Sequence, residues 1–312
     1  MSKPALIETK GLGKSFGPVR AVHDLSLRVE RGSITGFLGL NGSGKSTTLR
    51  IILGLLAPDQ GSFELFGAND RRGRAAALGR IGALVDSAAF YPRLTGRQNI
   101  RFLSGLGGYQ GEVDEVLEQV GLSDAADRPA RHYSLGMKQR LAIALALVGQ
   151  PELIILDEPT NGLDPNGIME MRRLIQKLNR ESGVTFFISS HLIHEIELIC
   201  DHVIMIESGQ LVFADRMDAL QSRLKGRFSL NCASKVDADR ALELLGQDDD
   251  CLNVKRIPSQ QIKFEISPDQ LGRLHRDLVK AGVEIRTLAE VRVTLEEFFL
   301  SQSSLRREGS LT

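Results

Sequence analysis

The sequence contains no apolar stretch of the length that a membrane span needs. Its most apolar helical candidate, residues 141–148, is far shorter than the about 20 residues of a transmembrane helix. No apolar run follows Met1, so a secretory signal is not expected either. The sequence therefore predicts a chain that does not cross a bilayer by itself.

Cysteine is scarce, and neither sign of charge is in excess. The three cysteines, Cys200, Cys232 and Cys251, share no metal-ligand spacing, which indicates free thiols in a reducing compartment rather than a disulfide framework or a zinc site. Lys plus Arg and Asp plus Glu both number 39, so the formal net charge is zero. This balance argues against a broad surface for nucleic acid or anionic membranes, and no nucleic-acid partner is expected.

The composition is that of an ordinary globular protein, with 42% hydrophobic and 25% charged residues among 312. That length suits one large and one small domain. Alternating apolar residues predict half-buried antiparallel strands at residues 25–29 and 62–66. Continuous apolar runs, which indicate a parallel α/β sheet covered on both faces, occur at residues 34–38, 81–85, 153–156 and 184–189. Between them, the stretch from about 90 to 148 has no convincing strand and predicts an inserted helical subdomain.

The pattern of predicted strands and helices changes after residue 224, where we expect the first domain, residues 1–224, to end. The second predicted domain, residues 225–300, has the order strand, helix, strand, strand, helix, strand, at 228–232, 238–245, 251–257, 261–266, 269–281 and 283–289. This βαββαβ order is the pattern of a ferredoxin-like unit, so a small C-terminal α+β domain is predicted. Because it carries no catalytic constellation, a regulatory or dimer-stabilising role is expected. A last helix at 294–300 precedes a tail, 301–312, that is expected to be disordered.

A glycine-rich loop follows the predicted strand at 34–38 and leads into a helix. It reads Gly39-Leu40-Asn41-Gly42-Ser43-Gly44-Lys45-Ser46-Thr47 and fits the phosphate-loop pattern. Glycines let backbone N–H groups turn inward around a polyphosphate, and the helix N-terminus adds the positive end of a dipole. Lys45 is expected to reach the β- and γ-phosphates, and the Ser46 hydroxyl to take a Mg²⁺ position. The alternative is a glycine-rich turn that binds nothing, which the strand–loop–helix context disfavours.

Two adjacent carboxylates, Asp157 and Glu158, end the apolar run at 153–156. Neighbouring residues on a strand point to opposite faces, so the two acids can take different roles. Asp157 is expected to hold Mg²⁺ directly or through water, and Glu158 to orient or deprotonate the water that attacks the γ-phosphate. The alternative interpretation is a solvated acidic strand end that begins a turn.

His191 follows the apolar run at 184–189, at the sheet edge where α/β proteins bind ligands. A histidine there can donate a hydrogen bond to the γ-phosphate. The rival interpretations are an ordinary histidine after a helix cap, and a metal site formed with His194, Glu195 and Cys200. The spacing His191-x-x-His194-Glu195 matches neither known order of helical zinc motifs.

Taken together, these motifs resemble those of an ABC transporter ATPase over residues 6–224. The resemblance rests on the phosphate loop and His191 together with Tyr133-Ser134-Leu135-Gly136-Met137-Lys138-Gln139-Arg140 and Asp157-Glu158-Pro159-Thr160-Asn161-Gly162-Leu163-Asp164. The stretch from Tyr133 to Arg140 looks like the signature of that family. The resemblance implies a phosphate-loop ABC ATPase fold, with a RecA-like parallel sheet core, an N-terminal antiparallel sheet and an inserted helical subdomain.

The resemblance also implies roles for residues whose chemistry alone is less specific. Phe16 resembles the aromatic residue on which adenine stacks, although a core phenylalanine is the alternative. Ser134 and Gly136 correspond to the pair that contacts the γ-phosphate held by the opposite subunit, and Ser134 has the alternative role of a helix N-cap. Asp164 resembles the loop residue that connects the two sites across the dimer.

The sequence departs from the family pattern at two places. Leu135 and Met137 stand where most members have a glycine and a glutamine. Asp86 stands where the family usually has Gln or Glu, and a shorter carboxylate can reach water or Mg²⁺ but cannot donate as an amide does. Asp86 is therefore a candidate metal-binding residue, and the way its loop couples ATP to transport is in question.

The family resemblance leads to a function. The signature, the stretch Phe90–Gly96 and the stretch Thr294–Leu300 look like those of bacterial drug- and peptide-antibiotic-export or immunity ATPases. We therefore expect a homodimer that sandwiches ATP and Mg²⁺ and powers a separate permease from the cytoplasmic face of the membrane. The alternatives are a soluble ABC-type ATPase acting on ribosomes or DNA, and a module that binds nucleotide without turnover.

Overall fold

The computed structural model describes residues 4–85, 90–109, 112–224, 226–257, 260–291 and 297–298. The chain divides into two units between Met217 and Asp218, and each is described by itself. This division falls at the start of helix α8 (Met217–Leu224), whereas the predicted boundary lies at its end. No helix in the described part of the chain is both long and apolar enough to span a bilayer.

The first unit begins with an antiparallel sheet built around β1 (Ala5–Phe16), which pairs with β2 (Val19–Leu25), β3 (Arg28–Glu30) and β5 (Gln60–Leu65). The strand predicted at 25–29 is interrupted, because Leu25 ends β2 and Arg28 begins β3, although both strands pair with β1 in the antiparallel sense. Its alternating residues Leu25, Leu27 and Val29 are buried, as predicted. The Thr9 hydroxyl on β1 bridges the break, since it donates to Leu25 O and accepts from Leu27 N.

A six-stranded sheet forms the centre of the first unit, in the order β10-β9-β4-β8-β7-β6. Its strands are β4 (Ile34–Leu38), β6 (Ile81–Leu84), β7 (Leu153–Asp157), β8 (Thr185–Ser190), β9 (His202–Glu207) and β10 (Gln210–Arg216). All neighbours are parallel except β9 and β10. The predicted parallel core is confirmed, and β4 and β8 are buried at every residue because both faces of the sheet are covered.

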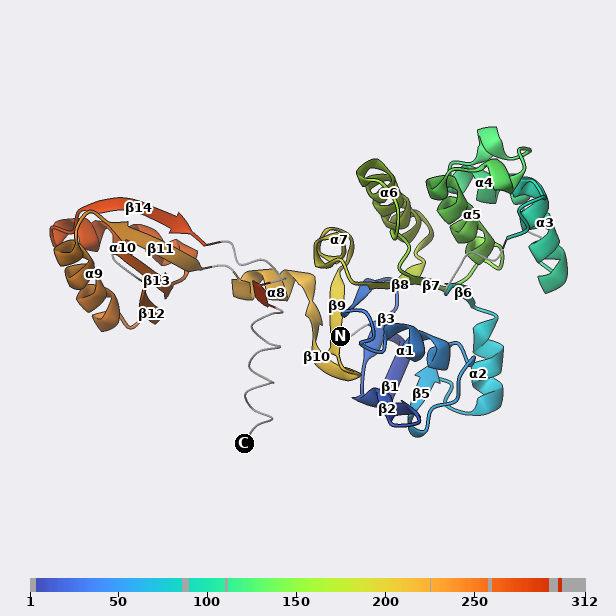
Figure 1. Ribbon diagram of the computed structural model, residues 1–312, viewed down its shortest axis with the longest axis horizontal. Helices are drawn as coiled ribbons and strands as arrows, with labels where there is room; N and C mark the ends of the chain where they lie inside the picture. The colour runs from blue at the N-terminus through green and yellow to red at the C-terminus, as the bar shows by residue number, and fades with distance from the viewer. Residues whose placement is uncertain are drawn as a thin grey trace. The chain divides into compact units, whose positions relative to one another are not determined.

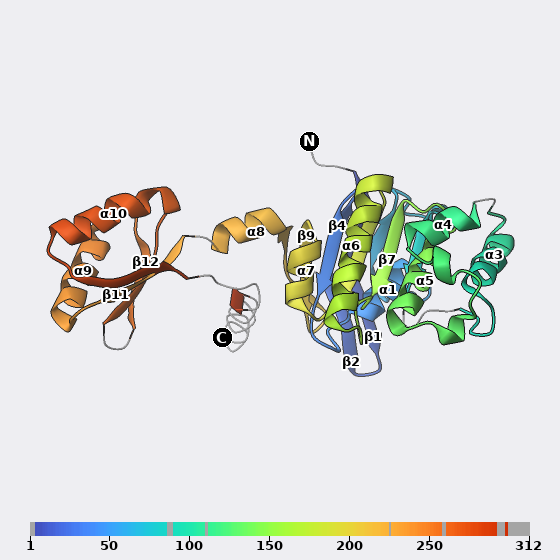
Figure 2. The ribbon, with the colours of Figure 1, turned by 90° about the horizontal axis from the view of Figure 1, so that it is seen from above.

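Helices cover the two faces of this sheet, as Figures 1 and 2 show. On one side, α1 (Lys45–Ile52) lies in a single hydrophobic core shared by the antiparallel sheet and the parallel sheet. α2 (Arg71–Leu78) follows β5 on the same side. On the other side lie α6 (Pro165–Ser182) and α7 (Ile193–Ile199).

The helical insertion lies between β6 and β7. It consists of α3 (Gly96–Gly107), α4 (Val113–Gln119), two short 3₁₀ turns (Ser123–Ala125 and Ala130–His132) and α5 (Leu135–Leu147). A reciprocal capping box of Thr95 and Gln98 begins α3. α5 packs closely on β6, since a Cβ at Gly82 would lie 2.2 Å from Ala146 O.

The second unit contains an antiparallel four-stranded sheet in the order β12-β13-β11-β14. Its elements are β11 (Arg227–Cys232), α9 (Lys235–Gln247), β12 (Leu252–Ile257), β13 (Gln261–Glu265), α10 (Pro268–Lys280) and β14 (Ile285–Glu290). Alternating residues of β11 and β13 pack with α9 and α10 in a separate core. Apart from Glu297 and Phe298, the predicted last helix and tail lie outside the described residues.

Candidate functional site

The loop between β4 and α1 has a shape that only glycine permits at two positions. A Cβ at Gly39 would lie 2.3 Å from Ser43 Oγ and 2.7 Å from Ile206 O. Gly44 has φ 103°, and a Cβ there would lie 2.3 Å from Ala21 O. Gly42 also has a positive φ, and Asn41 beside it is exposed. The loop therefore turns tightly enough to present its backbone N–H groups at the N-terminus of α1, where Thr47 lies in the first turn.

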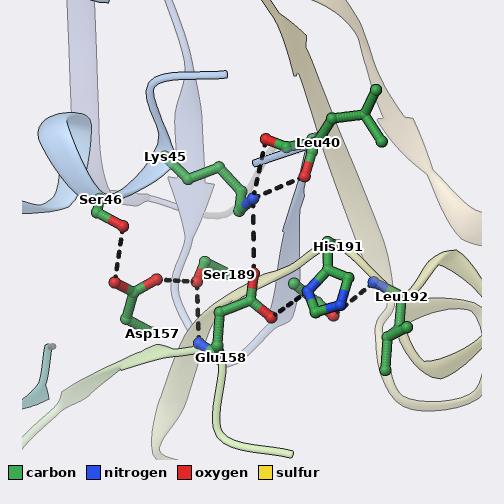
Figure 3. Close-up of polar contacts among 10 residues, drawn as sticks. Leu40, Lys45, Ser46, Asp157, Glu158, Ser189, His191 and Leu192 are labelled. Atoms are coloured by element: carbon green, nitrogen blue, oxygen red, sulfur yellow. Dashed lines mark hydrogen bonds and ion pairs between the residues drawn. The ribbon is translucent and has the colours of Figure 1, made fainter. Parts of the chain in front are cut away.

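Lys45 folds back under this loop (Figure 3). Its Nζ donates to Gly39 O at 2.6 Å and approaches Glu158 Oε1 at 3.5 Å, and the residue is 6% exposed. Nearby, Ser43 Oγ is buried and has no hydrogen-bond partner among the described residues. A buried hydroxyl without a partner is costly, so this loop suits a ligand that accepts hydrogen bonds. A polyphosphate has that chemistry.

The Asp157 carboxylate accepts hydrogen bonds from α1 and from the end of β8. Ser46 Oγ donates to Asp157 Oδ2 at 2.9 Å, and Ser189 Oγ donates to the other carboxylate oxygen. Parallel pairing of β7 with β8 sets this contact, because Asp157 and Ser189 are register partners. The sequence-based prediction missed Ser189, whose role depends on that register.

Glu158 lies opposite, against His191. Its carboxylate Oε2 is 2.8 Å from His191 Nδ1. Its backbone has φ 51°, a left-handed conformation that is rare outside glycine. Its N–H donates to both Ser189 O and Ser189 Oγ, at 3.2 and 3.1 Å, which holds that conformation. The structure thus brings together the predicted residues Lys45, Ser46, Asp157, Glu158 and His191.

The residues around Asp157 fit a Mg²⁺ ion that is shared with a phosphate. Mg²⁺ is usually bound through one or two carboxylates and substrate phosphates, and Ser46 with Asp157 supplies such a partial set of oxygens. No group of three or more His, Cys, Asp or Glu side chains placed to hold a metal occurs in the described ranges, so the rival site of His191, His194, Glu195 and Cys200 has no support. Asp86, the third predicted metal residue, lies outside the described residues.

Phe16 is 50% exposed at the end of β1, so the core interpretation of this residue is wrong. The ammonium of Lys14 lies 5.8 Å from its ring centroid. Asp59 holds this strand end, because its carboxylate accepts from Lys14 Nζ at 2.7 Å and from Ser15 N at 2.8 Å. An exposed, fixed aromatic ring of this kind is suited to stacking on a base.

Ser134, Gly136 and Asp164 lie at helix N-termini outside this network. Ser134 caps α5 and Asp164 caps α6, through Met137 N and Gly167 N respectively. No hydrogen bond or ion pair between described residues joins the three to Lys45, Asp157 or Glu158. A Cβ at Gly136 would meet nothing closer than a Leu163 carbon at 3.9 Å, so packing within the chain does not require glycine there.

The two residues that depart from the signature have partners within the chain. Leu135 is 46% exposed, and its Cδ2 would lie 3.2 Å from a Cβ at Gly162. Met137 Sδ accepts from Arg128 Nη2 at 3.1 Å. Leu135 and Met137, which occupy the glycine and glutamine positions of the signature, therefore both contact residues of neighbouring loops.

A groove of about 550 Å³ lies between β6 and the helical insertion. α3 contributes Leu103 and Leu106, α5 contributes Leu145, and Tyr109 closes one side. A second hollow of about 350 Å³ shares these three leucines and adds Phe102 and Tyr91. Leu106 is 70% exposed, so a large apolar side chain faces solvent here.

Comparisons with known proteins agree with this geometry. The family model described as ABC transporter matches residues 22–161. The bacitracin transport ATP-binding protein BcrA of Bacillus licheniformis is 40% identical over 297 residues, which cover 95% of this chain and 96% of that protein.

Two solved structures resemble the chain in fold. The structure of cbiO1 from Clostridium perfringens, part of the ABC transporter complex cbiONQ, has 27% identity and a TM-score of 0.63, and it covers 70% of this chain and 92% of that one. A dimeric ATP-binding cassette, MJ0796, in a post-hydrolysis state with ADP and Pi, has 26% identity and a TM-score of 0.60, with coverage of 68% and 98%.

Proposed function

Because the chain belongs to the ABC transporter ATP-binding proteins, we propose that it powers a separate permease in the export of a peptide antibiotic or similar amphipathic drug. ATP hydrolysis that drives transport is the activity of this family, and the chain has its cassette fold and an antiparallel C-terminal domain. The cargo is inferred from the bacitracin transport protein, which matches over nearly the whole chain. The observation that carries the proposal is the network of Lys45, Asp157, Glu158 and His191 around the phosphate loop.

In this proposal the loop and α1 bind the triphosphate of ATP. Lys45 exchanges its loop carbonyl partners for β- and γ-phosphate oxygens, and the buried Ser43 hydroxyl gains an acceptor. Ser46 and Asp157 hold Mg²⁺, which neutralises phosphate charge when bound. The adenine stacks on Phe16.

Glu158 acts on the attacking water. Its carboxylate accepts the proton as the water oxygen bonds to the γ-phosphorus and the bond to the bridging oxygen of ADP breaks. His191 holds this carboxylate through Nδ1, and its Nε2 has no hydrogen-bond partner among the described residues. We assign Nε2 to the γ-phosphate, to which it donates when both ring nitrogens carry a proton, because phosphate oxygens only accept hydrogen bonds.

A second copy completes the site. Ser134 and Gly136 do not bond to the phosphate loop of their own chain, and the open space at Gly136 supports their use by another protomer. The dimeric cassette with ADP and Pi is a precedent in a related protein. Asp164 then lies in the loop that joins the two sites.

The groove beside α3 and α5 is the proposed contact for the permease. Its aliphatic and aromatic lining suits a short amphipathic helix of a membrane protein. Because β6 lines the groove and pairs with β7, which ends at Asp157, motion of the helical insertion would pass between the groove and the nucleotide. A chain that acts through a permease lies on the cytoplasmic face of the membrane.

For the second unit we propose a ferredoxin-like domain, residues 225–300, that stabilises the dimer. The strand order β12-β13-β11-β14, with helices after β11 and β13, supports the ferredoxin-like arrangement.

The test of the proposed function compares ATP turnover in three proteins. Wild type hydrolyses ATP, Lys45→Ala does not, and Glu158→Gln binds ATP but turns it over at least about 100-fold more slowly. Glu158→Gln is also expected to accumulate as an ATP-bound dimer in analytical ultracentrifugation.

Sustained hydrolysis by Glu158→Gln would remove Glu158 from its assigned role. If wild type hydrolyses ATP but associates only with ribosomes or DNA, never with a permease, the soluble ABC-type ATPase is the correct function instead.

A further inference from the structure

His191 lies between the end of β8 at Ser190 and the start of helix α7 at Ile193. Only Leu192 separates His191 from the first residue of α7, and Ser190 Oγ accepts from Leu192 N at 2.9 Å. α7 has seven residues, too few to be stable without packing. β8 holds His191 on one side and α7 holds it on the other, so its position against Glu158 depends in part on what fixes α7.

Two neighbours fix α7. On the sheet side, Ile196 is buried over β4, where a Cβ at Gly36 would lie 2.4 Å from Ile196 Cγ2. Beside it, on the same face of the sheet, α6 lies alongside α7 in both ribbon views. Arg172 Nη2 of α6 is 3.1 Å from Glu195 Oε2 of α7, and Gln176 Nε2 donates to Leu198 O at 3.1 Å.

The ion pair of Arg172 and Glu195 is largely enclosed. The two side chains are only 22% and 13% exposed, and Arg172 Nε is buried with no partner among the described residues. An enclosed guanidinium depends on its counter-charge far more than an exposed one does. This pair is therefore a strict constraint on the spacing between α6 and α7.

α6 starts at the other loop of the site. Asp164 caps α6, and Pro165 is its first residue. Arg172 and Glu195 thus join two helices that each begin at a functional loop, one at Asp164 and one at His191.

We infer that the Arg172–Glu195 ion pair is a positioning device that holds His191 on Glu158 and links this contact to the Asp164 loop. This inference rests on the proposed function, in which Glu158 and His191 act in hydrolysis. The pair does not touch the phosphate loop and reaches the nucleotide only through His191, one of several groups assigned to ATP, so its loss affects the hydrolytic step much more than nucleotide binding.

Steady-state ATP hydrolysis by the full chain tests this inference with the isosteric variant Glu195→Gln. We expect kcat to fall about tenfold, with KM for Mg·ATP unchanged, because a charge-assisted hydrogen bond is lost at a distance from the phosphates. The control is Glu181→Gln, which breaks the exposed Lys177–Glu181 pair on α6, the helix of Arg172, and leaves kcat unchanged. A loss of kcat in Glu181→Gln equal to that in Glu195→Gln would overturn the inference.

A double-mutant cycle with His191→Ala separates positioning from general stability. If Glu195 acts through His191, Glu195→Gln causes no further loss of kcat in the His191→Ala background. An equal tenfold loss in both backgrounds would show that Glu195 does not act through His191. Should Glu195→Gln unfold below the assay temperature, Arg172→Lys, which keeps the charge but not the planar fork, takes its place in the cycle.

The outcomes also separate this inference from the proposed function. Normal turnover by Glu195→Gln, together with a defective His191→Ala, overturns the positioning role alone. Normal turnover by His191→Ala, or none by wild type, overturns the assigned hydrolytic roles and the positioning role with them.

Discussion

Glu158 has a backbone conformation that few residues other than glycine adopt, with φ 51°. Such a conformation costs of order 1–3 kcal/mol and persists only where the surroundings impose it. Ser189 imposes it here by accepting twice from Glu158 N, and the same serine donates to Asp157. One residue of β8 therefore contacts both the proposed base and the proposed metal-holding carboxylate.

Asp59 similarly holds the end of β1 that carries Phe16. Its carboxylate accepts from Lys14 Nζ and from Ser15 N, the two residues that precede the ring. The Lys14 ammonium, followed by the Ser15 N–H, lowers the pKa of Asp59 below its ordinary value of 3.8. Asp59 is thus ionised throughout the neutral range.

The variant Asp59→Asn is expected to weaken ATP binding only by weakening the contact between Phe16 and the adenine base. Because exposed ion pairs are worth little, KM for Mg·ATP should rise only about two- to fivefold, with kcat unchanged. Binding of Mg·tripolyphosphate, which has no base, should stay the same in a competition assay. The control Glu64→Gln removes the exposed partner of Lys10 on the same sheet.

The pH dependence follows from the lowered pKa of Asp59. A carboxylate whose pKa is lowered by folding contributes above its ordinary value of 3.8 and loses that contribution as pH falls through the folded value. ATP affinity should therefore show no Asp59-dependent change between neutral pH and about pH 5. A decline in that range that Asp59→Asn abolishes would contradict this account.

The residues of the site were predictable to different extents. Lys45, Ser46, Asp157 and Glu158 follow from local spacing at the end of a strand, which the sequence displays directly. Ser189 was not predictable in this way, because its role arises from the register of β7 with β8 across 32 residues of sequence. The sequence also contained no sign that Asp59 supports Phe16.

At the scale of elements, strands with continuous apolar residues were the easiest to predict. β4, β6, β7 and β8 all lie close to their predicted positions. β1 was missed because its burial does not alternate strictly and its pairing has several irregularities. β9 has the apolar run of a buried strand, Val203–Ile206, and the prediction omitted it.

A substitution in α3 tests whether the groove beside the helical insertion contacts the permease. The variant Leu106→Glu places a charge in an apolar surface, so association with the permease should weaken about tenfold or more. ATP hydrolysis by the isolated subunit should be unchanged, since no hydrogen bond or ion pair between described residues joins α3 to Lys45, Asp157, Glu158 or His191. Co-purification with the permease and ATPase assays measure the two effects.

A matched control for this variant is Leu55→Glu. Leu55 is 70% exposed, as is Leu106, but it lies between α1 and β5, outside the groove. Equal loss of permease binding in both variants would mean that the groove is not the contact.

At the scale of the whole molecule, the two units have separate hydrophobic cores. Residues such as Phe37 and Phe187 belong to the first core, and Phe228 and Phe264 belong to the second. Each unit can therefore keep its own fold when the other is removed.

Removal of residues 218–312 should weaken the dimer without unfolding the first unit. In the Glu158→Gln background, the ATP-bound dimer of the shortened chain should dissociate at about tenfold higher protein concentration than the dimer of the full chain. Analytical ultracentrifugation measures this difference, and thermal unfolding checks the first unit. Equal dimer stability in both chains would exclude a dimer-stabilising role for the second unit.

The position of β4 has a consequence for synthesis of the protein on the ribosome. β4 and its phosphate loop are made early, yet β4 pairs with β8 and β9, whose residues extend to Glu207. At roughly 5–20 residues per second, the nascent loop waits on the order of ten seconds or more for its neighbouring strands. A nascent chain that stalls before β9 therefore has every residue of the phosphate loop but not the complete sheet that supports it in the folded protein.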